Sequence, residues 1–340
     1  MGVYTSRYEG AEIDEKLSKV DEPFTSFEKE KLSRLTYENR TVYVDWATGN
    51  DDYDGSESKP FGTIQKAIDE KAETIYVAPG HYNEGLLIEN CNNVTILLNK
   101  KIEAERASIV IGGDETAYSS FSAVTIKNSS NIMMCDIIAE YIGADCFIIN
   151  DSTNIIFKNC AATDNDGYLK NGFAIRRSNV TMEKCFAAYL KGDGFLVKDD
   201  STATLKKCNA YNCDNGVTYS NYSEGFILGG EFCNCDTSGI NGPLEASNLT
   251  VVAVISHDNA YGIALGSSEN VVMSNLKSFN SLFINNETAD IKSVKSEILL
   301  LGTVYGVKDV DGSSIFNEYT VGGNTEEIAK ALDDINGEVV

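Results

Sequence analysis

The chain has 340 residues, 42% of them hydrophobic and 23% charged, which is the composition of a soluble globular protein. Its 28 basic and 51 acidic residues give a formal net charge of −23, which repels phosphate backbones and argues against a nucleic-acid partner. With 4 prolines and no apolar run of membrane-spanning length, the sequence also argues against collagen, disorder and membrane insertion.

Residues 1–40 predict a helical attachment or oligomerisation segment. Its start, "MGVYTSRYEGAEIDEKLSKV", is charged throughout and lacks the apolar core of a signal peptide, so we expect synthesis in the cytoplasm without a signal peptide. Release by lysis would leave the same sequence. Ile13, Leu17 and Val20 have the i, i+4, i+7 spacing of a short seam in a parallel helical bundle. An amphipathic helix packed on its own domain explains this stripe equally well.

Two stretches of this segment, "SRYEGAEIDEKLSKV" and "DEPFTSFEKEKLSRL", resemble short segments common in phage tail and fibre proteins of gut bacteria. In those proteins the segments precede a receptor-binding body. The resemblance implies a homotrimer that contacts other virion proteins through residues 1–40 and is located in the virion. A protein of the bacterial cytoplasm, or one encoded by a prophage, is the alternative.

The next stretch predicts the start of a coiled β-structure. A strand, an acidic loop, a helix near residues 62–72 and a second strand follow one another in "VYVDWATGNDDYDGSESKPFGTIQKAIDEKAETIYVAPGHYNE". Ile64, Ala67 and Ile68 lie on one face of that helix, which suits a cap over the open first coil.

This stretch resembles the first segment of right-handed parallel β-helix proteins of the pectate-lyase-like superfamily. The resemblance implies that fold for residues 41–300. The run "NDDYDG" also resembles the start of a calcium loop. Because Phe61 stands where such a loop needs a bidentate glutamate, we expect no calcium site of this type.

Two strand signals recur along the middle of the chain. One begins at residues 131, 154, 179, 202, 248 and 270, and the other follows a glycine at residues 172, 194, 216, 239 and 262. A period of about 22 to 25 residues, with short β-branched strands between Asn, Asp, Gly and Ser corners, is typical of a solenoid. The fixed leucine pattern of leucine-rich repeats does not occur. We therefore predict an all-β, right-handed parallel β-helix of about ten coils.

Cysteines return with this period, at Cys160, Cys185, Cys208 and Cys233. A metal site, a disulfide framework and a structural repeat are the three explanations. Cys233 and Cys235 are too close for a zinc knuckle, and only His81 and His257 could add imidazole ligands. We therefore expect neither a metal site nor a cofactor.

The repeat explanation assigns the cysteines to the interior. The sixth position after each strand start holds Ile137, Cys160, Cys185, Cys208, Val254 and Leu276. Because equivalent residues of stacked coils lie about 4.8 Å apart, the cysteines are predicted to form an interior column of small hydrophobic side chains. We expect reduced thiols in a chain without an export signal. A disulfide between adjacent coils is the alternative under oxidising conditions.

Residues 301–340 predict a C-terminal cap. The glycines in its first half no longer keep the period, so we expect this part to leave the regular solenoid. A terminal helix follows, capped by Asn324 or Thr325 and with Ile328, Leu332 and Ile335 on one face.

The resemblance to pectate-lyase-like proteins implies that a saccharide would bind along an outer face of the coils. Strict alternation after each repeat glycine places Arg176 and Lys198 side by side on one outer face. Two stacked cations repel each other unless a negative group lies near them. They are predicted either to clamp an acidic sugar, a uronate or a sialate, or to be neutralised by Asp199, Asp200 or Glu183 on a solvated face.

Tyrosines mark the same region. Tyr189 and Tyr211 each precede a corner glycine and are one period apart. They are predicted either to be a stacking platform for sugar rings or to turn inward as interior residues. Tyr168 lies in an insertion that lengthens one corner, and long corners often carry function.

Acidic residues also recur at the corners, at Asp166, Asp193, Asp214 and Asp236. Glycoside hydrolysis needs two such carboxylates close together. Tight-turn chemistry also explains Asp before Gly, and we favour it. A polysaccharide lyase would need a lysine or arginine base and a cation that neutralises the sugar carboxylate. Lys198 or Lys191 with Asp193 could supply these, although no sequence pattern singles them out. His257 is a lone corner histidine, for which we expect a structural role.

The predicted glycan-binding residues are therefore Arg176, Lys198, Tyr189, Tyr211, Tyr168 and Asp193, and no catalytic residue is assigned. We expect a phage fibre or tailspike-like protein that recognises a bacterial surface polysaccharide. A depolymerase on the same fold, either a lyase or a glycoside hydrolase, is one alternative. A purely structural head or tail fibre or decoration protein is the other.

Overall fold

The computed structural model describes residues 40–101, 108–113, 121–140, 142–163, 171–244, 248–266, 274–294, 296–311 and 314–319. The predicted N-terminal segment with its trimer seam, Tyr168 and the C-terminal helix lie outside these residues. No helix in the described ranges is long and apolar enough to cross a membrane.

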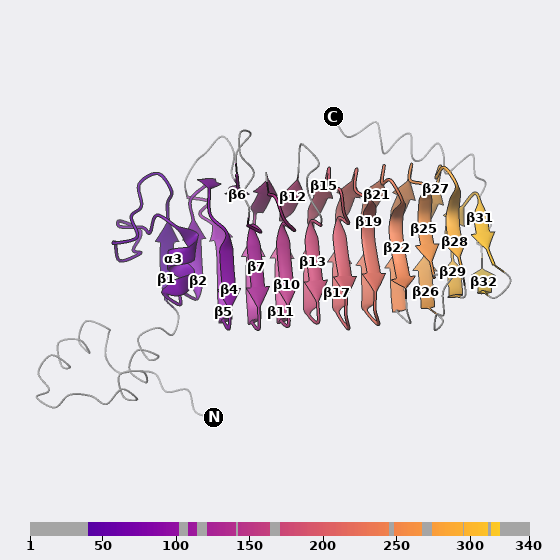
Figure 1. Cartoon of the computed structure of the whole chain (residues 1–340), viewed down its shortest axis with the longest axis horizontal. Helices are drawn as coiled ribbons and strands as arrows, with labels where there is room; N and C mark the ends of the chain where they lie inside the picture. Colours follow the sequence, from indigo (N-terminus) through magenta and orange to yellow (C-terminus); the bar gives the residue numbers. More distant parts are fainter. Residues whose placement is uncertain are drawn as a thin grey trace, which may run out of the picture.

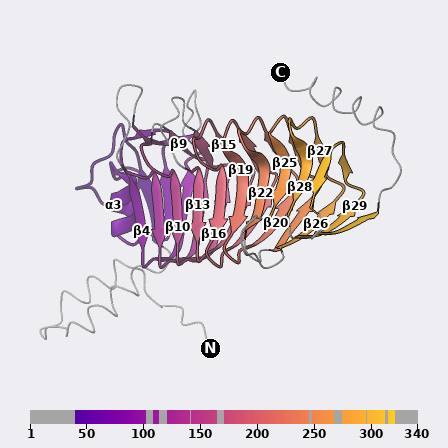
Figure 2. The same ribbon diagram turned by 45° about the vertical axis from the view of Figure 1, so that its right-hand side comes forward.

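The described chain winds through three β-sheets that run along the length of the molecule (Figure 1). Each turn, here called a coil, adds one strand to sheet 1, then one to sheet 2, then one to sheet 3. Neighbouring strands pair in parallel in every sheet. Figure 2 shows the coils stacked side by side around a shared interior. The predicted all-β parallel β-helix is therefore confirmed.

Sheet 1 has 12 strands: β1 (Thr41–Val44), β2 (Thr74–Val77), β5 (Asn92–Leu98), β8 (Ser130–Cys135), β11 (Thr153–Lys158), β14 (Asn179–Glu183), β17 (Thr202–Lys206), β20 (Glu224–Leu228), β23 (Asn248–Val252), β26 (Ser274–Phe279), β29 (Ser296–Leu301) and β32 (Ile315–Tyr319). Sheet 2 has 10 strands: β3 (Gly80–Tyr82), β6 (Ile109–Gly112), β9 (Ile137–Glu140), β12 (Ala161–Thr163), β15 (Phe186–Ala188), β18 (Asn209–Tyr211), β21 (Glu231–Cys233), β24 (Ile255–His257), β27 (Leu282–Ile284) and β30 (Val304–Tyr305). Sheet 3 has 10 strands: β4 (Leu86–Glu89), β7 (Val124–Lys127), β10 (Phe147–Asn150), β13 (Phe173–Arg176), β16 (Phe195–Lys198), β19 (Asn215–Ser220), β22 (Ser238–Leu244), β25 (Tyr261–Leu265), β28 (Ala289–Ser293) and β31 (Lys308–Val310).

The helix expected near residues 62–72 is α3 (Ile64–Asp69), at the indigo end of Figure 1. Its buried residues are Ile64, Ala67 and Ile68, the apolar face predicted to cap the first coil. This helix therefore covers apolar surface that the open end of the solenoid would otherwise expose to water.

Two carboxylates hold the start of this helix. Asp51, from the "NDDYDG" run, accepts hydrogen bonds from the backbone amides of Gly62 and Thr63 at 2.9 Å each. Glu84 accepts from the first two amides of the helix at 2.8 and 2.9 Å. Amides at a helix start have no intrahelical partner, so both acids stabilise α3. Burial raises the pKa of Glu84.

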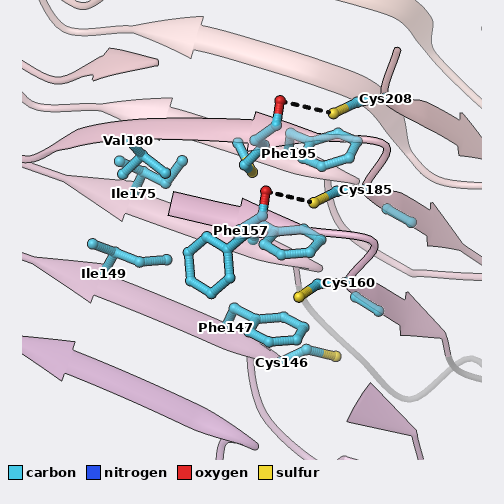
Figure 3. Packing of buried hydrophobic residues seen from close by; sticks show 14 of the residues in the cluster. Cys146, Phe147, Ile149, Phe157, Cys160, Ile175, Val180, Cys185, Phe195 and Cys208 are labelled. Atoms are coloured by element: carbon cyan, nitrogen blue, oxygen red, sulfur yellow. Dashed lines mark hydrogen bonds between the residues drawn. The ribbon is translucent and has the colours of Figure 1, made fainter. Parts of the chain in front are cut away.

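Aromatic side chains stack inside sheet 3. Phe147, Phe173 and Phe195 are register partners on β10, β13 and β16, and all three are fully buried. Figure 3 shows Phe147 and Phe195 in the interior. The Phe147 and Phe173 ring centroids are 4.5 Å apart, and those of Phe173 and Phe195 are 5.1 Å apart. The near-parallel rings follow directly from the parallel, in-register strands that carry them.

The predicted cysteine column exists at the corner between sheets 1 and 2. Cys160, Cys185 and Cys208 are buried there, and all nine cysteines are free thiols. The Cys185 thiol lies 3.7 Å from the carbonyl oxygen of Phe157, and the Cys208 thiol lies 3.5 Å from that of Met182 (Figure 3). These contacts cross between coils, so the thiols act as small core residues with a weak hydrogen bond.

Cys233 does not belong to this column, and its predicted place was wrong. It ends β21 and pairs in register with Tyr211 and His257 in sheet 2. Gly230 occupies the corner position instead, and a Cβ there would lie 2.1 Å from the carbonyl oxygen of Cys208. The recurrence of cysteine at about the repeat period, and not the strand alignment, had assigned Cys233 to the column; the corner before β21 holds two glycines instead.

Leu276 is also misplaced by the fixed offset. It lies within β26 and pairs in register with Leu249. The corner position of that coil belongs to Ser281, whose hydroxyl oxygen accepts a hydrogen bond from the Val254 amide at 3.3 Å. Val254 itself is buried at the predicted position.

The solenoid continues past residue 300, where a cap was predicted. Strands β30, β31 and β32 add to sheets 2, 3 and 1 in turn. Gly302 adopts a positive φ of 62° at the corner, as asparagines do at earlier corners, so the turn is preserved although the glycine spacing is not. The expectation that the chain leaves the coil directly after residue 300 was wrong.

Candidate functional site

Arg176 and Lys198 lie side by side on the outer face of sheet 3, as the alternation predicted. Arg176 ends β13 and Lys198 ends β16, and both side chains are half-buried. Three other residues of this face are small and well covered: Ala174 is 0%, Thr218 6% and Ser220 9% exposed. The two cations therefore stand beside a largely covered stretch of the sheet.

Asp145 neutralises Arg176, with 3.8 Å between guanidinium nitrogen and carboxylate oxygen. None of the three predicted partners takes this place. Asp199 instead accepts a hydrogen bond from Asn221, and Glu183 lies 4.0 Å from Lys158. Asp145 comes from the preceding coil, at a corner where the sequence showed no repeat signal.

Lys198 has no carboxylate within ion-pair distance among the described residues. It is thus the cation of this pair that could still receive an acidic group. Buried side-chain oxygens without a hydrogen-bond partner in the described part of the chain include Asn150 Oδ1, Asn215 Oδ1 and Ser238 Oγ, all on sheet 3 strands. Such atoms are rare in folded proteins, and because these three are inaccessible to solvent they cannot contact a ligand on the outer face.

Asp193 belongs to a polar column at the corner before sheet 3, formed by Asp145, Asn171, Asp193 and Asn215. Asn171 donates to the Asp145 carboxylate at 2.9 Å, and the Asp193 amide donates to the side-chain oxygen of Asn171 at 3.0 Å. Asn215 donates to the Asp193 carboxylate at 2.8 Å. Burial raises the pKa of Asp193, and the hydrogen bond from Asn215 opposes that shift.

We expect Asp193→Asn to stabilise the protein at neutral pH. Because the pKa of Asp193 is raised above the ordinary 3.8 in the folded state, stability is lost as the pH rises through that folded pKa. Asparagine keeps the oxygen that accepts from Asn215 but never ionises. Urea unfolding should therefore show a higher free energy of unfolding for Asp193→Asn than for the unaltered protein at pH 7. This difference should disappear at about pH 3, where Asp193 is protonated in both the folded and the unfolded state.

The exposed corner acid Asp236 supplies the control for this comparison. Asp236→Asn removes the same charge without removing a buried carboxylate. An equal gain in both variants at pH 7 would contradict this prediction, because it would point to net charge rather than burial.

Tyr189 and Tyr211 lie on the outer side of sheet 2 and its corner, so their predicted interior alternative was wrong. Tyr189 is 48% exposed, and Tyr211 is half-buried. Their ring centroids are 5.7 Å apart and the planes meet at 82°. An edge-to-face pair offers one ring face to a sugar but not a flat two-ring platform.

A hollow on the outer face of sheet 1 was not predicted. Tyr43 and Tyr76 are register partners on β1 and β2, with ring centroids 5.5 Å apart and planes at 23°. Leu97 of β5 continues this row. These residues form the floor of an open cavity of about 680 Å³, here called the sheet 1 cavity.

Lysines surround the sheet 1 cavity. Its lining includes Lys100, Lys101 and Lys158, with Asp136 as the carboxylate among them. Each lysine has a carboxylate partner: Lys101 lies 2.9 Å from Glu57, Lys100 lies 3.9 Å from Asp136, and Lys158 lies 4.0 Å from Glu183. Because these pairs lie at the surface, an acidic ligand would compete with the three carboxylates for the ammonium groups. Glu57 raises the pKa of Lys101. In a chain of net charge −23, this group of cations around two stacked rings stands out.

One sequence signal could have located this cavity. The strands "VYV" at 42–44 and "IYV" at 75–77 both carry tyrosine at the centre, and "NKK" at 99–101 follows the next strand. The two tyrosines are separated by more than one repeat period because α3 and its loop lie between their strands. A search at the repeat period therefore passes over them.

A second cluster lies on the outer face of sheet 2. The carboxylate of Glu231, the thiol of Cys233 and the imidazole of His257 lie within 4.8 Å of one another. His257 Nε2 is 2.8 Å from Glu231, and Nδ1 is 2.6 Å from Asp258. The Cys233 thiol, then the Glu231 carboxylate, raise the pKa of His257 to about 11. His257 is thus not the isolated corner residue that the sequence suggested.

The three parallel sheets and the polar outer faces define a parallel β-helix protein. A family model described as "right handed beta helix region" matches residues 75–225 and 169–325, which is more than half of the chain. The chain therefore belongs to the right-handed β-helix family. Among curated proteins, none matches this sequence significantly.

Solved structures share the fold at low identity. The A-module of mannuronan C-5 epimerase AlgE4 from Azotobacter vinelandii has a TM-score of 0.51 and 13% identity, covering 82% of this chain and 100% of that module. A rhamnogalacturonan lyase has a TM-score of 0.48 and 15% identity, covering 77% and 73%. The enzymatically active domain of bacteriophage CBA120 tailspike protein 2 has a TM-score of 0.38 and 13% identity, covering 77% of this chain and 43% of that chain. At these identities the similarity is one of fold.

Proposed function

We propose that this protein is a β-helical attachment protein that binds an anionic glycan in the sheet 1 cavity. The observation that carries the proposal is the combination of the stacked Tyr43 and Tyr76 rings with Lys100, Lys101 and Lys158 around one hollow.

The chemistry of this cavity fits an acidic sugar. Tyrosine presents an apolar ring to sugar C–H groups and a hydroxyl to sugar oxygens. Lysine ammonium groups form charge-assisted hydrogen bonds with carboxylates. A mostly apolar floor with a few polar groups at the rim is the usual composition of a small-molecule site. A uronate or sialate residue has a ring for the tyrosine floor and a carboxylate for the lysines. The same sugars were considered for Arg176 and Lys198 on sheet 3.

The attachment role is a proposal about the whole chain. The resemblance of residues 1–40 to phage tail and fibre segments supports a homotrimeric virion fibre that contacts other virion proteins and recognises a bacterial surface polysaccharide. Those residues lie outside the described ranges. Light scattering on the full chain would test the trimer.

An isothermal titration with oligogalacturonate, using neutral maltooligosaccharide of the same length as the control, tests the glycan proposal. We expect the uronate to bind at least about tenfold more tightly, because one or two charge-assisted hydrogen bonds contribute about 1.4 kcal/mol or more. Added salt should weaken the binding of oligogalacturonate but not that of maltooligosaccharide. Equal affinities, or no binding of either sugar, would contradict the proposal.

A glycoside hydrolase is the second candidate, and the polar corner column favours it. Asp145 and Asp193 lie two coils apart, with Asn171 hydrogen-bonded to both. Two coils span about 10 Å, near the upper end of the carboxylate separation in inverting enzymes. A carboxyl with a raised pKa, as in Asp193, usually serves as the acid, and an ion-paired carboxylate, as in Asp145, usually serves as the base. Release of reducing ends that Asp193→Asn abolishes would support this function, whereas an unsaturated product would indicate a lyase.

A further inference from the structure

We propose that Glu231, Cys233 and His257 form a zinc site on the outer face of sheet 2. Glu231 and Cys233 are alternate residues of β21, with the buried Phe232 between them, so both side chains point outward. His257 ends the neighbouring strand β24 and is the register partner of Cys233. The strand geometry therefore brings three different ligand types to one place.

The distances suit a small ion. His257 Nε2 and a Glu231 carboxylate oxygen are 2.8 Å apart, and all three ligand atoms lie within 4.8 Å of one another. Zinc bonds of about 2.0 to 2.3 Å in a tetrahedron place ligand atoms about 3.3 to 3.7 Å apart. Zinc binding therefore requires the Glu231 and Cys233 side chains to rotate until their ligand atoms lie at these separations.

Asp258 orients the histidine for this role. Its carboxylate lies 2.6 Å from His257 Nδ1, on the opposite side of the ring from Glu231. A metal-bound histidine usually donates its second ring N–H to a carboxylate, which fixes the tautomer and the direction of the free nitrogen. This arrangement leaves Nε2 directed at the position between Glu231 and Cys233.

The set of ligands selects the ion. A thiolate and an imidazole favour zinc over magnesium or calcium, which prefer oxygen ligands only. Three protein ligands leave a fourth position for water or for another ligand. On binding, zinc displaces to solvent the proton of the Cys233 thiol and the proton between His257 and Glu231. The His257 side chain is 16% exposed, so the ion can reach it from solvent.

The test is a zinc titration of the full chain after chelation and reduction, read with a competing chromophoric chelator and repeated with Co²⁺. We expect one zinc per chain and a thiolate-to-cobalt charge-transfer band. Cys233→Ser and His257→Gln should each weaken zinc binding by at least about 100-fold, and Asp258→Asn by about tenfold. Circular dichroism of each variant without metal checks that the coil is intact.

Cys91→Ser is the matched control, because Cys91 is a partly exposed thiol outside the cluster. It should bind zinc like the unaltered protein. Absence of zinc binding in the unaltered protein would overturn the proposal. So would binding that survives Cys233→Ser with intact fold, or binding that Cys91→Ser removes. Should Cys233→Ser fail to fold, the cobalt spectra of His257→Gln and Asp258→Asn decide the same question.

Discussion

Gly194→Ala should lower the free energy of unfolding by about 3 kcal/mol or more. An alanine Cβ at this position would lie 2.6 Å from the carbonyl oxygen of Gly216 and 2.9 Å from the Cβ of Ala210. The oxygen belongs to the backbone of the next coil, so a rotamer change cannot relieve the clash. The Gly194 amide also donates to the Asn215 carbonyl oxygen at 2.8 Å, and displacement of the backbone would weaken that bond.

The glycine repeated at the start of the sheet 3 strands from β13 to β25 thus has a physical cause. A Cβ added at Gly172 would likewise lie 2.6 Å from the carbonyl oxygen of Gly194. At Gly172 and Gly194 the backbone of one coil packs directly on that of the next, and a side chain at either position would collide with it. The regular glycine spacing seen in the sequence is the spacing of these contacts.

Gly242→Ala is the matched control. Its Cβ would lie 3.5 Å from the nearest atom, the Cβ of Tyr219, which is ordinary van der Waals contact. We expect Gly242→Ala to change the free energy of unfolding by less than about 1 kcal/mol. Urea unfolding followed by circular dichroism measures both variants, and equal midpoints would show that the glycine column is not required by packing.

The triple variant Lys100→Gln, Lys101→Gln and Lys158→Gln should weaken oligogalacturonate binding by about 100-fold. Three lost charge-assisted contacts of about 1 kcal/mol each account for a change of this size. Neutral sugars should be affected far less, because the Tyr43 and Tyr76 floor remains. Isothermal titration at low salt gives the largest difference between the two sugars.

A second triple variant removes the same charge elsewhere. Lys206, Lys207 and Lys277 are exposed and do not line the sheet 1 cavity. Their replacement by glutamine should leave oligogalacturonate affinity within about twofold, apart from the general loss of positive charge. Equal losses in the two triple variants would mean that net charge, and not the cavity, governs binding.

The fold could be predicted because its signals are local and periodic. Glycines before sheet 3, the capping face of α3 and the alternation that exposes Arg176 and Lys198 each repeat or match a known local pattern. Predictions that depended on a fixed offset failed where corners change length. Leu276 was misplaced for that reason, whereas Cys233 was misplaced because the recurrence of cysteine alone assigned it to the column.

The candidate sites were harder to predict because they join residues from different coils. Asp145, the partner of Arg176, lies in the preceding coil at an irregular corner. His257 follows Cys233 by one coil and lies beside it in space. Metal-ligand spacing rules for short loops do not consider such separations, although the repeat period itself makes these residues adjacent.

A crystal structure of the full chain with bound oligogalacturonate tests the central claim most directly. We predict sugar density over Tyr43 and Tyr76, with carboxylates within hydrogen-bond distance of Lys100, Lys101 or Lys158. Density on sheet 3 beside Lys198, or no density at a saturating concentration of the sugar, would contradict the proposed site.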